Sequence, residues 1–229
     1  MALQKRMETI ANNVANSSVA GFRAEQTKFE AVMSDAASEP VAFASSGDTY
    51  IDLTPGRLIP TGNPLDMAVR GDAWFAIETP SGTVYTRDGR MQITPEGGLQ
   101  SIDGYPVLDV GGAPLQIDPN GGPIEIAQDG MITQNNLQIG AVGLFTIDPQ
   151  ASLSRFENSG VIPDKPATPA LDFARVGVQQ GHIESSNVNP MWEMSQLSMV
   201  SRNYDAVANS INQSQDSLAE AIKALGPSS

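Results

Sequence analysis

The chain has 229 residues, of which 40% are hydrophobic and only 17% are charged, so it is long enough for one large or two modest domains. Its net charge of −13 would repel nucleic-acid phosphates and anionic lipid headgroups, and no basic run offsets that charge. The charge therefore argues against binding to nucleic acids or to membrane surfaces, and the lack of an apolar run of membrane-spanning length argues against direct membrane insertion. The absence of cysteine excludes disulfides, thiolate chemistry and the commonest zinc ligand.

The first predicted element is a short amphipathic helix over residues 1–16. Its apolar side chains are spaced four, three and four positions apart and form one narrow stripe: Leu3, Met7, Ile10 and Val14. Asn12, Asn13 and Asn16 lie off this stripe, where neutral hydrogen-bonding groups can face other chains at less cost than charged groups. Because a helix of about 14 residues is marginal alone in water, we expect it to need a partner.

The middle of the chain is predicted to be an antiparallel β domain. Glycine-containing turns recur between Leu65 and Phe145, and short alternating or β-branched runs such as TVYTR and RMQIT separate them. The four prolines of residues 146–180 indicate a loop-rich return segment. The predicted divisions are a helix and turn at 1–33, an extended connector at 34–64, a β-rich domain with its return segment at 65–180, and a C-terminal motif and helix at 181–229.

Two local patterns inside this domain lead to specific expectations. The Asp-Gly pairs at positions 88, 103 and 129 lack the acidic ladder and closing glutamate of a calcium loop, so they are predicted to be hairpin turns. Trp74 and Phe75 lie in a strand-like run and are predicted to belong to the core.

The C-terminal part is predicted to be one long helix over residues 191–225, with Asn189-Pro190 at its entry and Gly226-Pro227 at its exit. Apolar or small residues repeat with a seven-residue period in two series: Leu197, Tyr204, Ile211, Leu218 and Leu225, and then Val200, Val207, Ser214 and Ala221. The outer faces carry mainly Ser, Asn and Gln. Such a surface is typical of a helix buried against other protein, and a low-charge solvated helix is the alternative.

These elements predict an α+β fold, with a central, mostly antiparallel β domain and terminal helices paired as a coiled-coil-like stem. We expect residues 1–16 to pair with residues 191–225 along the two apolar stripes. Because the stripe of one helix does not obviously offset the entropy of ordering it, we also expect both ends to fold on assembly.

Catalytic chemistry has little support in the sequence. His182 is the single histidine, and no GxSxG elbow accompanies it, so we interpret it as structural. No phosphate-binding glycine loop, cofactor motif or metal-ligand spacing is present either. A β module that binds carbohydrate stays open as an alternative, and it would need exposed aromatic side chains among Trp74, Phe75, Tyr85 and Tyr105.

Three motifs together resemble the rod and hook proteins of the bacterial flagellum. They are ANNVANSSVAGFR near the start, LDMAVRGDAWFAI with VYTRDGRMQIT in the middle, and GHIESSNVNP with MSQLSMVSRNYDAVANSI near the end. The resemblance covers nearly the whole chain. Within the family, the length and the central motif are most similar to the proximal rod subunits, and the distal rod subunits are the alternative.

The resemblance implies a structural, non-enzymatic subunit of the flagellar basal-body rod, the periplasmic drive shaft that transmits motor torque. It implies self-assembly with copies of the chain and with other rod subunits, and export by the flagellar type III apparatus without a cleaved signal peptide. Its motifs place assembly residues at Asn12, Asn13, Asn16, Gly21, Phe22, Glu184 and Asn187, and the apolar stripes add Leu3, Met7, Ile10, Val14, Leu197, Val200, Tyr204, Val207, Ile211 and Leu218.

Overall fold

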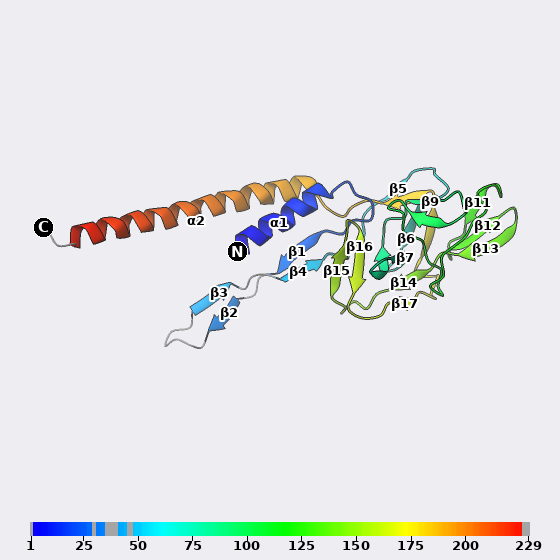
Figure 1. Ribbon diagram of the computed structural model, residues 1–229, viewed down its shortest axis with the longest axis horizontal. Helices are drawn as coiled ribbons and strands as arrows, with labels where there is room; N and C mark the ends of the chain where they lie inside the picture. The colour runs from blue at the N-terminus through cyan, green and yellow to red at the C-terminus, as the bar shows by residue number, and fades with distance from the viewer. Residues whose placement is uncertain (1, 29–30, 35–40, 45–47, 226–229) are drawn as a thin grey trace. The chain divides into compact units, whose positions relative to one another are not determined.

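The computed structural model describes residues 2–28, 31–34, 41–44 and 48–225 (Figure 1). Its contacts divide the chain into two compact units, each built from segments that are distant in sequence. Unit 1 consists of Met1–Val14, Thr27–Thr49 and Asn189–Ser229, and unit 2 consists of Ala15–Gln26 and Tyr50–Val188.

Unit 2 contains a six-stranded antiparallel sheet with the strand order β15-β16-β8-β7-β14-β17 (Figure 1). In that order the strands are Leu153–Phe156, Gly160–Pro163, Gly82–Thr86, Trp74–Thr79, Leu144–Thr146 and Thr168–Pro169. The sheet confirms the predicted antiparallel β domain. It also includes three strands from the predicted loop-rich return segment. Pro163 and Pro169 lie at strand ends and the other two prolines lie outside the strands, so they do not prevent pairing.

Smaller antiparallel sheets complete unit 2. One has three strands, β11 (Ile124–Ile126), β12 (Met131–Gln134) and β13 (Leu137–Ala141). Three others are pairs: β9 (Met91–Ile93) with β10 (Leu99–Ser101), β6 (Met67–Arg70) with β18 (Gly177–Gln180), and β5 (Leu58–Pro60) with β19 (His182–Glu184). Apart from these sheets, β1 (Glu25–Lys28) and β4 (Asp48–Ile51) form a separate two-stranded sheet.

The core of unit 2 lies around β7. Phe75 is fully buried and Trp74 almost so, which confirms both as core residues. The main buried cluster around Phe75 draws on most of the strands and includes Met67, Val69, Ile77, Val84, Leu99, Val107, Ile132 and Leu144. Because β7 is buried along nearly its whole length, its sequence WFAIET reads as a continuous apolar run and not as an alternating one.

Two of the three Asp-Gly predictions are confirmed. Gly104 and Gly130 adopt positive φ in turns that follow β10 and β11. The prediction for Asp88-Gly89 is wrong, since β8 does not pair with the strand that follows it. A Cβ at Gly89 would lie 1.5 Å from the Met67 carbonyl oxygen, so the glycine permits a close approach to β6 instead of a hairpin turn.

Unit 1 contains the two helices and a short hairpin. The helices, α1 (Ala2–Ala15) and α2 (Pro190–Leu225), confirm the predicted terminal helices. The hairpin pairs β2 (Ala31–Ser34) with β3 (Val41–Ala44). The Asn189 side chain caps α2 by accepting a hydrogen bond from the Trp192 N–H at 3.2 Å, and Pro190 occupies the first helical position, where its missing N–H costs least.

Candidate functional site

The three sequence motifs meet at a buried charge cluster in unit 2, formed by Arg23, Arg87 and Glu184. Glu184 ends β19, Arg87 follows β8, and Arg23 precedes β1. Arg23 Nη2 lies 2.8 Å from Glu184 Oε1, and Arg87 Nη1 lies 3.1 Å from Glu184 Oε2. All three side chains are at most 3% exposed. One carboxylate therefore faces two guanidinium groups away from water.

Backbone carbonyls and one aromatic ring complete the surroundings of the two arginines. Arg87 donates to the carbonyl oxygens of Val69 at 3.2 Å and Gly71 at 2.5 Å, and Arg23 donates to that of Thr54. The Trp74 ring centroid lies 5.7 Å from Arg23 Cζ and 5.2 Å from Arg87 Cζ. The electron-rich ring face favours a nearby cation.

Burying these charged side chains costs desolvation free energy, which the ion pairs in the cluster offset. Burial lowers the pKa of Arg87 to about 10 and also lowers the pKa of Arg23, while the charge of Glu184 opposes both shifts. Within the described residues, Arg23 Nε, Arg23 Nη2 and Arg87 Nε have no hydrogen-bond acceptor, so the Arg23–Glu184 contact is an ion pair without hydrogen-bond geometry. The charge of the Glu184 carboxylate is therefore the main compensation for burying the two arginines.

Main-chain bonds hold the N-terminal motif against the C-terminal motif beside the cluster. The Gly21 N–H donates to the Glu184 carbonyl at 2.8 Å, and the Asn187 N–H donates to the Phe22 carbonyl at 3.3 Å. The Asn187 side chain accepts from the Ala24 N–H at 2.7 Å and donates to the carbonyls of Asp52 and Thr54. Asn187 thus joins three backbone segments at once.

At Gly21, the contact between the N-terminal motif and the strand segment of Arg87 leaves no space for a side chain. Its φ is +66°, in the left-handed region that favours glycine. A Cβ there would lie 2.2 Å from the Asp88 nitrogen and 2.3 Å from the Arg87 carbonyl carbon. The N-terminal motif can therefore approach the strand segment that carries Arg87 only with glycine at position 21.

These positions change the interpretation of four predicted assembly residues. Gly21, Phe22 and Glu184 are buried inside the chain, and Asn187 is partly buried with its polar groups bonded internally. Within this chain they join parts of one subunit, and their contribution to contacts between subunits stays a prediction. Arg23 and Arg87 were not predicted. Their signal was that each lies in a family motif, Arg23 at the end of ANNVANSSVAGFR and Arg87 inside VYTRDGRMQIT, within a chain that has few charges.

The two helices contact one another near the start of α2. Asn13 Nδ2 donates to Glu193 Oε1 at 3.2 Å, and Arg6 Nη2 donates to Gln196 Oε1 at 2.9 Å. Val200 is buried, whereas the next two positions of the same stripe, Tyr204 and Val207, are about half exposed. The covered part of the stripe is therefore short, and a coiled-coil stem along the whole of α2 remains a prediction.

The remaining predicted helix residues differ in burial. Ile10 and Asn13 are buried, so Asn13 bonds within the chain instead of facing outward. The partly buried residues are Leu3, Met7, Asn12, Val14, Asn16 and Leu197. The side chains of Ile211 and Leu218 lie outside the described residues.

Replacing Asn13 with alanine is expected to weaken the contact between α1 and α2 by about 1 kcal/mol, because Glu193 loses its donor. Burial already raises the pKa of Glu193, and the bond from Asn13 opposes that shift. Amide hydrogen exchange across residues 3–14 should become several-fold faster. Gln4→Ala is the matched control because it removes an exposed bond to Glu8; equal exchange in the two variants would contradict the expectation.

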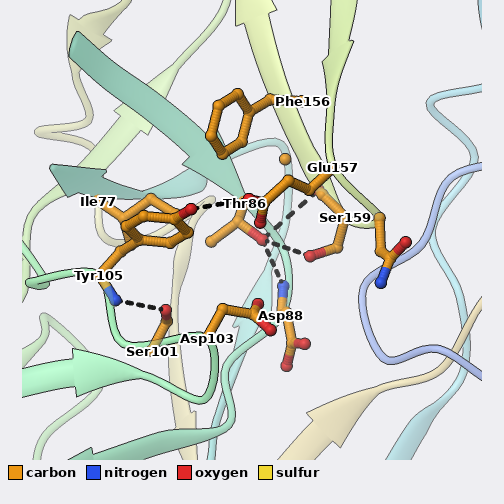
Figure 2. A pocket seen from close by; sticks show the side chains of 11 residues that line it. Ile77, Thr86, Asp88, Ser101, Asp103, Tyr105, Phe156, Glu157 and Ser159 are labelled. Carbon is orange, nitrogen blue, oxygen red and sulfur yellow. Dashed lines mark hydrogen bonds between the residues drawn. The ribbon is translucent and has the colours of Figure 1, made fainter. Parts of the chain in front are cut away.

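A small polar pocket in unit 2, lined by residues that include Thr86, Ser101 and Tyr105, has a volume of about 10 Å³ (Figure 2). Figure 2 shows Tyr105 and Glu157 directed toward each other, with 2.7 Å between the Tyr105 hydroxyl and Glu157 Oε1. Burial, followed by the charges of Asp88 and Glu157, raises the pKa of Asp103 at its rim. The volume is enough for about one water molecule and too small for a sugar.

The structure gives no support to a glycan site or to catalysis by His182. Trp74 and Phe75 are buried, which leaves only Tyr85 and Tyr105 partly accessible of the four candidate aromatics. His182 lies in β19, where its ring nitrogens contact Gln179 Nε2 and the Gln180 carbonyl. Over the part of the chain that the structure describes, no group of acidic or histidine side chains is arranged to hold a metal.

Family models match three separate regions of the chain. Residues 1–23 match the flagella basal body rod protein model, residues 68–134 match the flagellar hook protein FlgE/F/G D1 domain, and residues 179–224 match the flagellar basal body rod FlgEFG protein C-terminal model. The three matched regions contain Arg23, Arg87 and Glu184 respectively. The cluster thus joins one residue from each region.

Similarity to curated proteins extends over the full length. The chain is 49% identical over 229 residues to the flagellar basal-body rod protein FlgF of Mesorhizobium japonicum, covering 100% of the chain and 95% of that protein. The chain belongs to the flagellar basal-body rod protein family. The rod protein is also 46% identical to FlgF of Rhizobium meliloti, with 100% of the chain and 95% of that protein covered. It is 29% identical to FlgG of Agrobacterium fabrum, over 89% of the chain and 87% of that protein.

The rod protein is a structural subunit of the flagellar basal-body rod, as the resemblance in the sequence predicted. The glycan-binding alternative is not favoured. None of the helices in the described ranges of the rod protein is both long and apolar enough to cross a membrane.

Proposed function

We propose that the rod protein is a proximal subunit of the rod and assembles with copies of itself and with other rod subunits through α1 and α2. The observation that carries the proposal is the full-length similarity to FlgF proteins, at 49% and 46% identity, against 29% for a FlgG protein. In this proposal, the FlgF relatives represent the proximal subunit and the FlgG relatives represent the distal alternative. The proposed site of action is the periplasmic part of the basal body, reached by type III export without a cleaved signal peptide.

In the proposed mechanism, one set of residues anchors segments within the subunit and a different set makes the contacts between subunits. The cluster of Arg23, Arg87 and Glu184 anchors the segment after α1 and the segment before α2 to the β-rich unit. The exposed remainder of the α2 stripe, beginning with Tyr204 and Val207, then packs against helices of neighbouring subunits. Neutral Ser, Asn and Gln side chains on the outer faces lower the cost of burying those faces.

A deletion strain tests the proximal assignment. We expect cells that lack the rod protein not to swim, and we expect their basal bodies to end at the inner-membrane ring, because a missing proximal segment blocks every later addition. Expression of the wild-type chain should restore both. Electron microscopy of purified basal bodies gives the readout; normal swimming would refute the function, and a rod that stops only near its outer end would indicate a distal position.

A further inference from the structure

Arg155 of β15 contacts the N-terminal motif from a part of the chain that the matched family regions do not include. It lies between the matched residues 68–134 and 179–224. β15 is an edge strand of the six-stranded sheet, where β16 is its neighbour. The Arg155 side chain is only 14% exposed, although it carries a charge. Two of its hydrogen-bond partners are 130 and 132 positions away, so the fold alone brings them together.

The Arg155 guanidinium donates through all three of its nitrogens, and two of these bonds reach the segment that leads into β1. Nε donates to Glu25 Oε1, and Nη2 donates to the Arg23 carbonyl at 2.5 Å. The guanidinium carbon lies 4.4 Å from the centroid of the buried Phe22 ring, so the cation also contacts an aromatic face. The planar fork of an arginine can make these contacts at once, whereas the compact ammonium group of a lysine cannot.

The third bond holds Arg155 to the turn between β15 and β16. Nη1 donates to the Asn158 carbonyl at 2.9 Å. In the same turn, the buried Ser159 hydroxyl lies 3.1 Å from the Thr86 hydroxyl of β8, and Figure 2 shows these two side chains directed toward each other. The turn is therefore tied to the core of unit 2, and Arg155 reaches the N-terminal motif from a supported position.

We propose that Arg155 is a positioning residue for rod assembly, which holds residues 22–25 in one path from the N-terminal motif into β1. This role rests on the proposed function. Glu184 contacts the Arg23 side chain, whereas Arg155 binds the Arg23 carbonyl and the residues on either side of it. If residues 22–25 could take several paths, only a fraction of the subunits would be competent for assembly at any moment, and incorporation would fall by that fraction.

Arg155→Lys tests the proposal because lysine keeps the positive charge but loses the fork. The variant is expressed in the deletion strain at the wild-type level, and the rod protein in purified basal bodies is measured by quantitative mass spectrometry. We expect a loss of about fivefold or more. Arg175→Lys is the matched control. Arg175 is 85% exposed and its ion pair with Asp172 spans 4.0 Å, so this variant should be incorporated like the wild type.

Amide hydrogen exchange on the purified variants distinguishes positioning from general stabilisation of unit 2. In Arg155→Lys we expect exchange at residues 22–28 to become about fivefold faster or more, while exchange in β7 and β8 stays unchanged. A residue that only stabilised the unit would change the exchange of both regions together. Arg175→Lys should leave both regions unchanged.

Three outcomes would overturn the proposal. Wild-type incorporation of Arg155→Lys would mean that the charge alone is sufficient, and equal acceleration of exchange in β7 and at residues 22–28 would mean that Arg155 only stabilises unit 2. If Arg155→Lys does not fold, Glu25→Gln weakens the same contact more mildly, and wild-type incorporation with unchanged exchange in that variant would be the third. Swimming of the deletion strain would instead count against the proposed function, whatever the variants at position 155 do.

Discussion

Replacing Glu184 with glutamine is expected to lower the free energy of unfolding of unit 2 by about 3–5 kcal/mol. The substitution keeps the size of the side chain but removes the carboxylate that contacts both Arg23 and Arg87. Two buried guanidinium groups would then lack their charged partner, and their desolvation would no longer be offset. Urea unfolding followed by Trp74 fluorescence, in a Trp192→Phe background, measures the change in unit 2.

Glu157→Gln is the matched control for this experiment. Glu157 is an exposed carboxylate that accepts a hydrogen bond from Tyr105, so its loss should change the free energy of unfolding by at most about 1 kcal/mol. Equal effects of the two substitutions would contradict the role assigned to the buried cluster. A double variant, Glu184→Gln with Arg23→Met, should recover part of the loss because it also removes one uncompensated charge.

Replacing Gly21 with alanine is expected to separate the N-terminal motif from the β-rich unit. Alanine at a φ of +66° costs about 1–2 kcal/mol, and the overlap of its Cβ with the backbone of Arg87 and Asp88 adds about 1–3 kcal/mol. The Gly21 bond to the Glu184 carbonyl would be disrupted by the same movement. Denaturant unfolding measures the total, and amide exchange at residues 21–24 should become much faster.

Gly104→Ala isolates the contribution of the close approach. Gly104 also has a positive φ, +89°, but a Cβ there would meet nothing within 4 Å. This control should therefore show only the backbone cost of about 1–2 kcal/mol. If Gly21→Ala were no more destabilising than Gly104→Ala, the result would contradict the inferred tight packing of the N-terminal motif against the backbone of Arg87.

The sequence was sufficient for elements that depend on local spacing. The four-three-four spacing of Leu3, Met7, Ile10 and Val14 predicted α1, and the Asn189-Pro190 pair located the start of α2. Turn chemistry located Asp103-Gly104 and Asp129-Gly130. The same turn rule gave a wrong prediction at Asp88-Gly89. Gly89 is required there because its backbone lies close to that of Met67, which is distant along the chain.

The charge cluster depends on three-dimensional neighbours and could not be predicted in the same way. Glu184 is one of 26 acidic residues, and Arg87 lies 97 positions before it, so no local pattern identifies them as partners. The family resemblance selected Glu184 and Gly21 but gave them an assembly role, since a motif does not reveal which side chains are buried. Both residues are buried at the junction between the motifs of one subunit, and their assembly role stays a prediction.

The amount of rod protein in purified basal bodies is the most direct test of whether the buried charge cluster is needed for assembly. We propose that the cluster of Arg23, Glu184 and Arg87 holds the segments that contain these residues in place, so that the subunit can enter the rod. Wild-type, Glu157→Gln and Glu184→Gln chains would be expressed to equal cellular levels in the deletion strain and measured in basal bodies by quantitative mass spectrometry. We predict wild-type amounts for Glu157→Gln and at least a tenfold loss for Glu184→Gln. Incorporation of Glu184→Gln at the wild-type level would contradict the account.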